Sequence, residues 1–143
     1  MERPVILMAV APRAVGIVRE RLGDEFELVP VRTLDEALQR LARGAIDGIL
    51  AGLHFDGSTM PKLLDAVKAD PSTREIPFVC CRLLPTLLLR ASLRAARQVC
   101  DALGADGFID VVEIEHREGV AAARERLRNA LQRAVRYPGN AAV

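Results

Sequence analysis

The sequence is poor in aromatic residues, in cysteine and in net charge. Its 143 residues include no Trp, one Tyr and four Phe, so a surface that stacks aromatic rings on nucleic-acid bases is not expected. The formal net charge of +1 argues against a strong overall field that would attract a polyanion. The three cysteines, Cys80, Cys81 and Cys100, are odd in number and form no disulfide pattern. This usage favours a reducing compartment.

Long apolar runs are also missing. The N-terminal run over residues 4–10 is too short to cross a membrane, and no signal-peptide cleavage region follows it. We therefore expect a cytoplasmic protein that does not associate with membranes. The length predicts one domain over residues 1–137, followed by a flexible tail over residues 138–143.

Short apolar segments alternate with helical patterns along the whole chain. The predicted strands cover residues 5–10, 26–31, 46–53, 76–81 and 108–112. Such alternation predicts a three-layer α/β fold with a parallel five-stranded sheet of the flavodoxin-like type, in the order 2-1-3-4-5. Pro30 places the second strand at an edge, because proline cannot donate to a central ladder. Thr33 and Glu36 predict a capping box at the start of the second helix.

The sequence offers little recognisable catalytic chemistry. His54 and His116 have no set of metal-ligand residues at a suggestive spacing, and no glycine-rich phosphate loop is present. Cys80 and Cys81 are expected to point to opposite faces of one strand and to be buried. We therefore expect no catalytic residues, no metal, no cofactor and no enzymatic activity.

Three local motifs resemble the receiver domains of bacterial response regulators. They are A-D-P-S-T-R-E-I-P-F at residues 69–78, G-A-D-G-F-I at residues 104–109, and the pair Leu63–Leu64. The resemblance covers nearly the whole chain and implies a receiver (CheY-like) fold. It also implies a place in two-component signal transduction.

The same resemblance shows where the switch residues of a receiver would fall. The phosphoacceptor aspartate falls on Gly52, and the acidic pair that holds Mg²⁺ falls on the segment around Ala11. The Thr or Ser after the fourth strand falls on Arg82, and the Lys after the fifth strand falls on Val111. Magnesium needs oxygen ligands and phosphoryl transfer needs a nucleophile, and these residues supply neither. The chain is therefore expected to be a pseudo-receiver that binds no Mg²⁺.

Two polar residues near this degenerate pocket have alternative interpretations. Asp56 is the nearest substitute carboxylate, although an aspartate in a loop more often caps a turn. Arg82 either pairs with Asp56 or Asp110 and locks the loops, or lies solvated at the surface.

The arginines of the last two predicted helices form a candidate interface. Arg90, Arg94 and Arg97 share one helix face, beside an acidic rim that includes Asp110 and next to the apolar Leu87. Arg124 and Arg128 add positive charge to the final helix. Receivers commonly dimerise through this helix 4–strand 5–helix 5 face, although an ordinary solvated helix face has the same composition.

The expected function is phosphorylation-independent protein–protein interaction in bacterial signalling, with a protein partner or a second copy of the chain. One alternative is a nucleic-acid-associated module that uses the helix arginines, which the low net charge disfavours. The other is a small-ligand-binding domain, which would need a deep polar pocket at the carboxyl ends of the strands.

Overall fold

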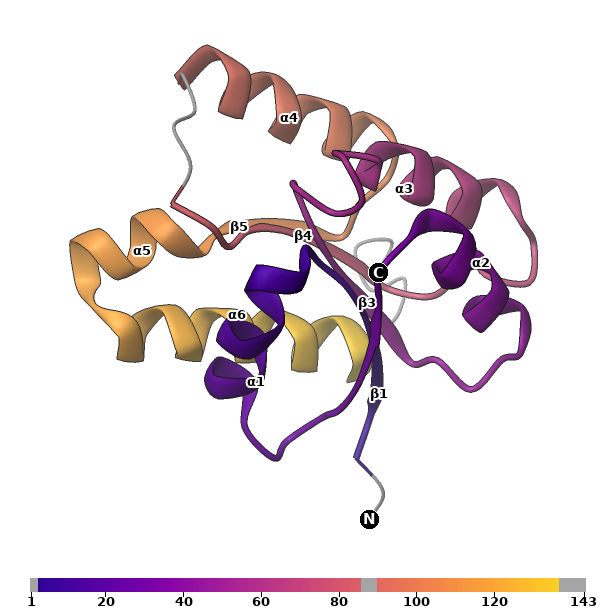
Figure 1. Ribbon diagram of the computed structural model, residues 1–143, viewed down its shortest axis with the longest axis horizontal. Helices are drawn as coiled ribbons and strands as arrows, with labels where there is room; N and C mark the ends of the chain where they lie inside the picture. The colour runs from indigo at the N-terminus through magenta and orange to yellow at the C-terminus, as the bar shows by residue number, and fades with distance from the viewer. Residues whose placement is uncertain (1–2, 86–89, 137–143) are drawn as a thin grey trace.

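The fold is a parallel five-stranded sheet covered by helices on both faces (Figure 1). A computed structural model describes residues 3–85 and 90–136. The strand order β2-β1-β3-β4-β5 confirms the predicted topology and places β2, with its Pro30, at an edge. The strands are β1 (Val5–Ala9), β2 (Glu27–Val31), β3 (Gly48–Gly52), β4 (Phe78–Arg82) and β5 (Gly107–Asp110).

Alternate residues of the central strands build two separate cores, one on each face of the sheet. Met8, Leu50 and Cys81 point into one core, whereas Ala51 and Cys80 point into the other. The first core is covered by the short 3-10 helix η1 (Pro12–Ala14), by α1 (Val15–Leu22) and by α6 (Val120–Arg136). The second core is covered by α2 (Leu34–Ala42), α3 (Met60–Ala69) and α4 (Arg90–Ala102).

The predicted capping box starts α2. The Thr33 hydroxyl accepts a hydrogen bond from the Glu36 backbone N–H at 3.1 Å. The Glu36 carboxylate accepts one from the Arg32 backbone N–H at 2.7 Å, one residue before the position of the standard box.

The C-terminal third differs from the prediction. β5 ends at Asp110, and a separate helix α5 (Val111–Glu118) begins there in place of the predicted strand end. The Asp110 carboxylate accepts a hydrogen bond from the Glu113 backbone N–H at 3.0 Å, which caps the helix and stops the strand. Val111 is therefore the first residue of a helix, not the last residue of a strand.

Gly119 separates α5 from α6. Its φ of 94° lies in the region that favours glycine, so the chain turns here and begins a new helix. The predicted core residues Ala123, Leu127 and Leu131 of α6 are buried, but Val120 is 42% exposed because it lies at the turn.

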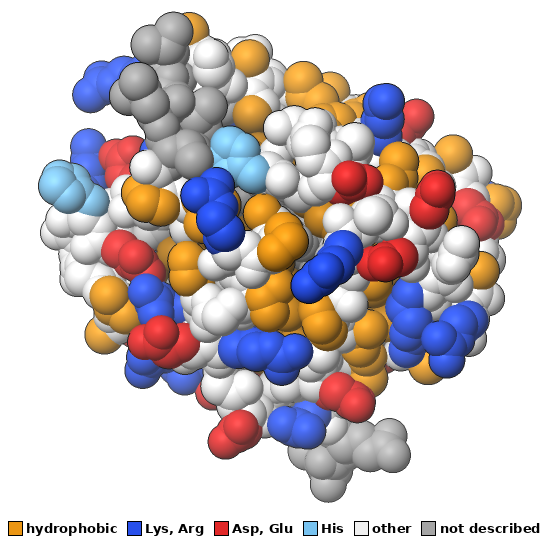
Figure 2. Space-filling model, viewed as in Figure 1, with side chains coloured by type: hydrophobic (Ala, Val, Ile, Leu, Met, Phe, Trp, Pro, Cys, Tyr) orange, Lys and Arg blue, Asp and Glu red, His pale blue; other side chains and the backbone are white. Residues whose placement is uncertain are grey.

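Two parts of the predictions lie outside the described residues: the interface residue Leu87 and the tail over residues 138–143. None of the helices within residues 3–85 and 90–136 is long and apolar enough to cross a membrane. Figure 2 shows one face of the molecule, on which basic and acidic side chains are interspersed around a central apolar area.

Candidate functional site

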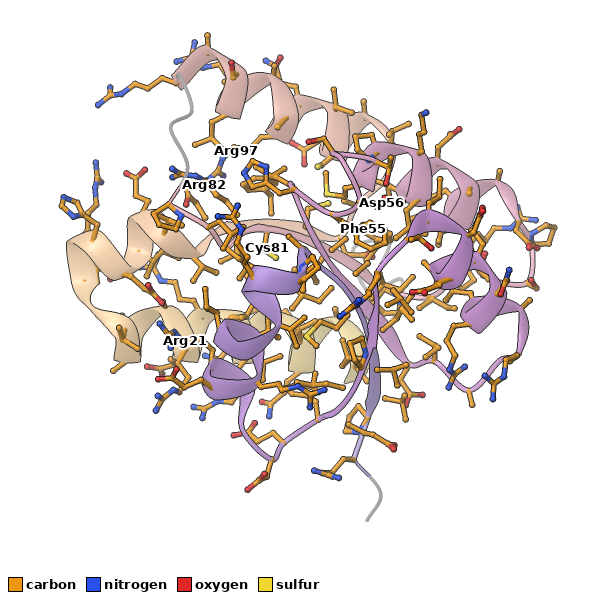
Figure 3. The ribbon with its side chains drawn as sticks, viewed as in Figure 1. Arg21, Phe55, Asp56, Cys81, Arg82 and Arg97 are labelled. Carbon is orange, nitrogen blue, oxygen red and sulfur yellow. The ribbon has the colours of Figure 1, made fainter. Side chains whose placement is uncertain are left out.

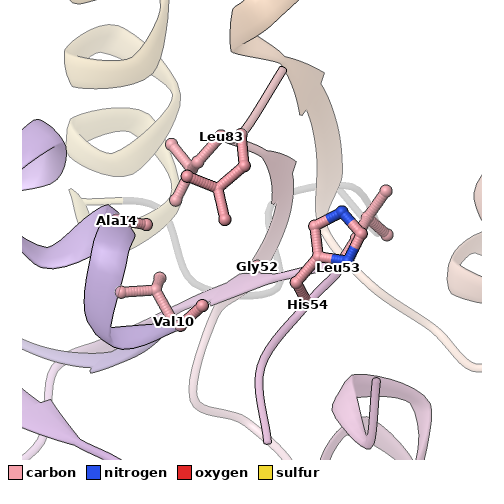
Figure 4. Close-up of a pocket in the computed structure, with 8 residues that line it drawn as sticks. Val10, Ala14, Gly52, Leu53, His54 and Leu83 are labelled. Atoms are coloured by element: carbon pink, nitrogen blue, oxygen red, sulfur yellow. The ribbon is translucent and has the colours of Figure 1, made fainter. Parts of the chain in front are cut away.

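The carboxyl ends of β1, β3 and β4 meet in a small apolar pocket (Figure 4). Its lining includes Val10, Ala11, Gly52, Leu83 and Leu84, so the structure brings together two of the predicted pocket residues, Ala11 and Gly52. The cavity volume is ≈ 10 Å³, which is about the space of one water molecule. The deep polar pocket that a small-ligand binder would need is therefore absent from this position.

The helix α5 packs into the same apolar core that surrounds this pocket. Its residues Val111 and Ile114 are 1% and 9% exposed, and they belong to the same buried cluster as Val10, Leu83 and Leu84. Burial of an aliphatic side chain of this size stabilises a fold by about 1.5–3 kcal/mol. The strand ends are thus filled with hydrocarbon where a metal site would need oxygen atoms.

A buried ion pair fixes the start of α5. The Arg82 Nη1 lies 3.3 Å from both carboxylate oxygens of Asp110, and the two side chains are 14% and 4% exposed. Of the two interpretations of Arg82, the structure shows the ion pair with Asp110, and the solvated surface arginine that the sequence favoured is wrong. Adjacent strands explain the contact, because β4 and β5 pair Arg82 directly with Asp110 in the sheet register.

A second ion pair holds the other end of α5. Arg21, on α1, lies 2.7 Å from a carboxylate oxygen of Glu115, and its side chain is only 11% exposed. This contact joins residues 94 positions apart in the chain. No sequence motif marks it, because neither residue stands out until α5 is recognised as a helix.

Asp56 lies away from the pocket, beside the start of α2 (Figure 3). Its carboxylate accepts a hydrogen bond from the Leu34 backbone N–H at 2.8 Å, so it caps α2 together with Thr33. The predicted pairing of Asp56 with Arg82 is therefore wrong. Asp56 has a positive φ of 42°, which aspartate tolerates better than most residues.

The outer face formed by α4, β5 and α5 contains a groove of ≈ 390 Å³. Arg97 of α4 lies over the ring of Phe108 in β5, 4.6 Å from the ring centroid. Two ion pairs line the same groove, Arg117–Glu113 at 3.1 Å and Arg126–Glu118 at 2.9 Å. We call this surface the α4–α5 groove.

The predicted interface residues divide between this groove and other places. Arg90, Arg94 and Arg97 are exposed on α4, and Arg124 is exposed on α6. Arg128 lies outside the groove lining and pairs with Glu25 at 3.1 Å, in the connection between α1 and β2. Asp110 is part of the groove lining, but it is 4% exposed and paired with Arg82.

Sequence reasoning placed Glu113 in the acidic rim and Arg126 among the arginines of the final helix, but it did not single out Arg117. Arg117 lines the groove because residues 111–118 form the separate helix α5. Within the part of the chain that the structure describes, no group of three or more His, Cys, Asp or Glu residues is placed to hold a metal ion.

Solved structures share this fold over nearly their whole length. The phosphorylated cyanobacterial phytochrome response regulator RcpA superposes with a TM-score of 0.70 at 17% identity, over 93% of this chain and 94% of that chain. A chemotaxis response regulator of Vibrio cholerae gives 0.65 at 16% identity, over 90% and 99% of the two chains. The receiver domain of a sensor histidine kinase from Pseudomonas aeruginosa, which has a magnesium ion coordinated in its active site cleft, gives 0.68 at 17% identity, over 94% and 98%.

These likenesses confirm the receiver fold that the residue motifs predicted. No protein-family model matches the chain, and no curated protein matches its sequence.

Substitutions of Gly52 test whether the pocket at the strand ends is apolar. A Cβ at this position would lie 3.6 Å from Val10 and 3.7 Å from Leu83, which is ordinary contact, so Gly52→Ala is expected to change the free energy of unfolding by no more than about 1 kcal/mol. Gly52→Asp would bury a carboxylate against the same carbons. It is expected to lower that free energy at neutral pH by about 3–5 kcal/mol, as measured by urea denaturation.

The loss should shrink at acidic pH, because burial raises the pKa of a carboxyl group and the protonated form is less costly to bury. A Gly52→Asp variant as stable as Gly52→Ala at neutral pH would show that the pocket accepts charge and water.

Proposed function

We propose that this chain is a receiver-type signalling module that acts through protein contacts and does not use phosphorylation. The observation that carries the proposal is the apolar lining of the strand ends by Val10, Ala14, Leu83 and Leu84 around Gly52. RcpA was solved in a phosphorylated form and the sensor-kinase receiver with magnesium, so the fold can carry that chemistry when it has the residues. In this chain the nearest carboxylates, Asp56 and Asp110, are already engaged as helix caps.

The proposed module has one fixed conformation at its strand ends. A phosphorylation switch needs loops that rearrange when charge is added. Here α5 packs two buried side chains into the core cluster beside the strand ends, and two ion pairs tie it to β4 and α1. Recognition therefore falls to the outer surface, in keeping with a cytoplasmic interaction module.

We infer that the α4–α5 groove is the contact surface, with a second copy of the chain as its first partner. The groove presents both signs of charge, with Arg97, Arg117 and Arg126 beside Glu113 and Glu118. A two-fold interface requires a patch that complements itself, and a mixed patch of this kind satisfies that requirement. The same acidic partners weaken the case for nucleic-acid binding, because Arg117 and Arg126 are already paired.

Phosphorylation independence predicts no response to phosphoryl donors. Incubation of the ¹⁵N-labelled protein with acetyl phosphate and Mg²⁺, or with beryllofluoride and Mg²⁺, should leave the amide spectrum unchanged. The reason is that no carboxylate faces the pocket to accept a phosphoryl group or to bind the metal. A phosphorylated species of increased mass, or shifts at Gly52 and its neighbours, would contradict the proposal.

The contact surface can be tested with two matched charge reversals. Arg97→Glu lies in the groove, whereas Arg128→Glu lies outside it and pairs with Glu25. Like-charge contacts at an interface are strongly unfavourable, so Arg97→Glu should raise the dimer dissociation constant about tenfold or more, and Arg128→Glu should leave it near the parent value. Sedimentation equilibrium measures both.

If the parent protein is monomeric at high concentration, the proposed homodimer is contradicted. Equal weakening by both variants would show that association does not use the groove.

A further inference from the structure

The two edges of the sheet are protected differently. β2 forms one edge and β5 forms the other. In β2 the Glu27 N–H donates a hydrogen bond to the Pro4 carbonyl oxygen at 2.9 Å, toward β1. Backbone groups alternate in direction along a strand, so Leu28 and Pro30 direct theirs outward. Pro30 has no N–H to offer there, and a proline at such a position hinders the addition of another strand.

The β5 edge has no such proline. Within residues 3–85 and 90–136, no strand pairs with the outer side of β5. Alternate residues of an edge strand direct their N–H and C=O groups away from the sheet. β5 lies between α4 and α6 (Figure 1), and its half-buried residues Phe108 and Ile109 line the α4–α5 groove. The open edge of the sheet therefore faces this groove.

We propose that an extended, acidic segment of a partner protein adds to the outer edge of β5 as a further strand and lies in the α4–α5 groove. In this mode of recognition, main-chain hydrogen bonds supply affinity and alternate side chains supply specificity. The inference rests on the proposed role of the groove as a contact surface, and it names a second kind of occupant for it.

The charge of the groove walls selects an acidic segment. Exposed arginines that share one face of α4 form no ion pair with any described residue, and they are Arg90, Arg94 and Arg97. On the opposite wall, the arginines of α5 and α6 are neutralised by the two ion pairs described above. The excess positive charge therefore lies on α4, where carboxylates complement it. The β5 strand of a second copy supplies none, because its one acidic residue is buried in an ion pair.

The two faces of β5 determine the pattern of the added strand. Phe108 packs against the core that α4 covers, whereas Ile109 packs against the core that α6 covers. Side chains of an added strand alternate between the same two faces. Those beside Phe108 approach Arg97, which lies over its ring, and those beside Ile109 approach the buried Ile114. The segment that fits best therefore alternates acidic and apolar residues.

The probe is a synthetic peptide of sequence EVEVEVE, labelled with fluorescein and titrated with the purified full chain. Fluorescence anisotropy should show saturable binding, and a peptide with lysine at each glutamate position should bind about tenfold or more weakly. The bound peptide should also slow amide hydrogen exchange in β5 and leave that of β2 unchanged.

Two N-methylated peptides test strand addition without any change to the protein. One carries N-methyl groups on its glutamates and the other on its valines. Alternate amides of an added strand face β5 and the rest face away, so one of the two peptides should bind about tenfold or more weakly than the parent peptide and the other should not. Equal affinity of the two methylated peptides would overturn strand addition and leave the groove as a contact surface.

A matched pair of variants locates the site. Arg97→Glu in the groove should raise the dissociation constant of the peptide about tenfold or more, and Arg128→Glu outside it should not. Absence of binding, or β5 amides that become protected only as the protein concentration rises, would overturn the proposal. Sedimentation equilibrium of the parent protein decides the proposed homodimer separately from these results.

Discussion

The packing of α5 against the carboxyl ends of the strands determines what this fold can do. Val111 and Ile114 are buried in the same core cluster as Val10 and Leu83, which contact Gly52, and the Arg82–Asp110 pair holds the first turn of the helix in place. The pair is nearly dry, so removing one partner would leave a buried charge without compensation. Apolar contact and a buried ion pair therefore act on the same helix, beside the strand ends.

This arrangement keeps the receiver fold with an apolar pocket at the carboxyl ends of β1, β3 and β4. The two cores, the strand order and the parallel register do not depend on the residues of a phosphorylation site, so their loss leaves the sheet intact. The carboxylates that remain near the strand ends serve as caps, Asp56 for α2 and Asp110 for α5. Under the proposed function, recognition has moved to the outer surface, where Arg97 and Phe108 line the α4–α5 groove.

The sequence predicted most of the fold, because buried parallel strands appear as short apolar runs between helical patterns. It did not predict that the strand ends at Asp110 and that a helix begins there. The Asp110 carboxylate accepts a hydrogen bond from the Glu113 backbone N–H, and this helix cap outweighs the strand preference of Val111 and Val112. That error left out α5, the helix that brings Glu113 and Arg117 to the α4–α5 groove. The ion pairs Arg82–Asp110 and Arg21–Glu115 join residues distant in the chain, so they depend on register and packing that composition does not reveal.

The central claim, that the strand ends hold no metal, is tested most directly by paramagnetic relaxation with Mn²⁺. A manganese ion bound near the strand ends would broaden the amide signals of Val10, Gly52 and Leu83 far more than those of the opposite edge of the sheet. We expect equal, weak broadening at all of these positions, at any Mn²⁺ concentration up to about 1 mM. The reason is that none of the residues that line the pocket at the strand ends carries a carboxylate. Selective loss of the Val10 and Gly52 signals would contradict it.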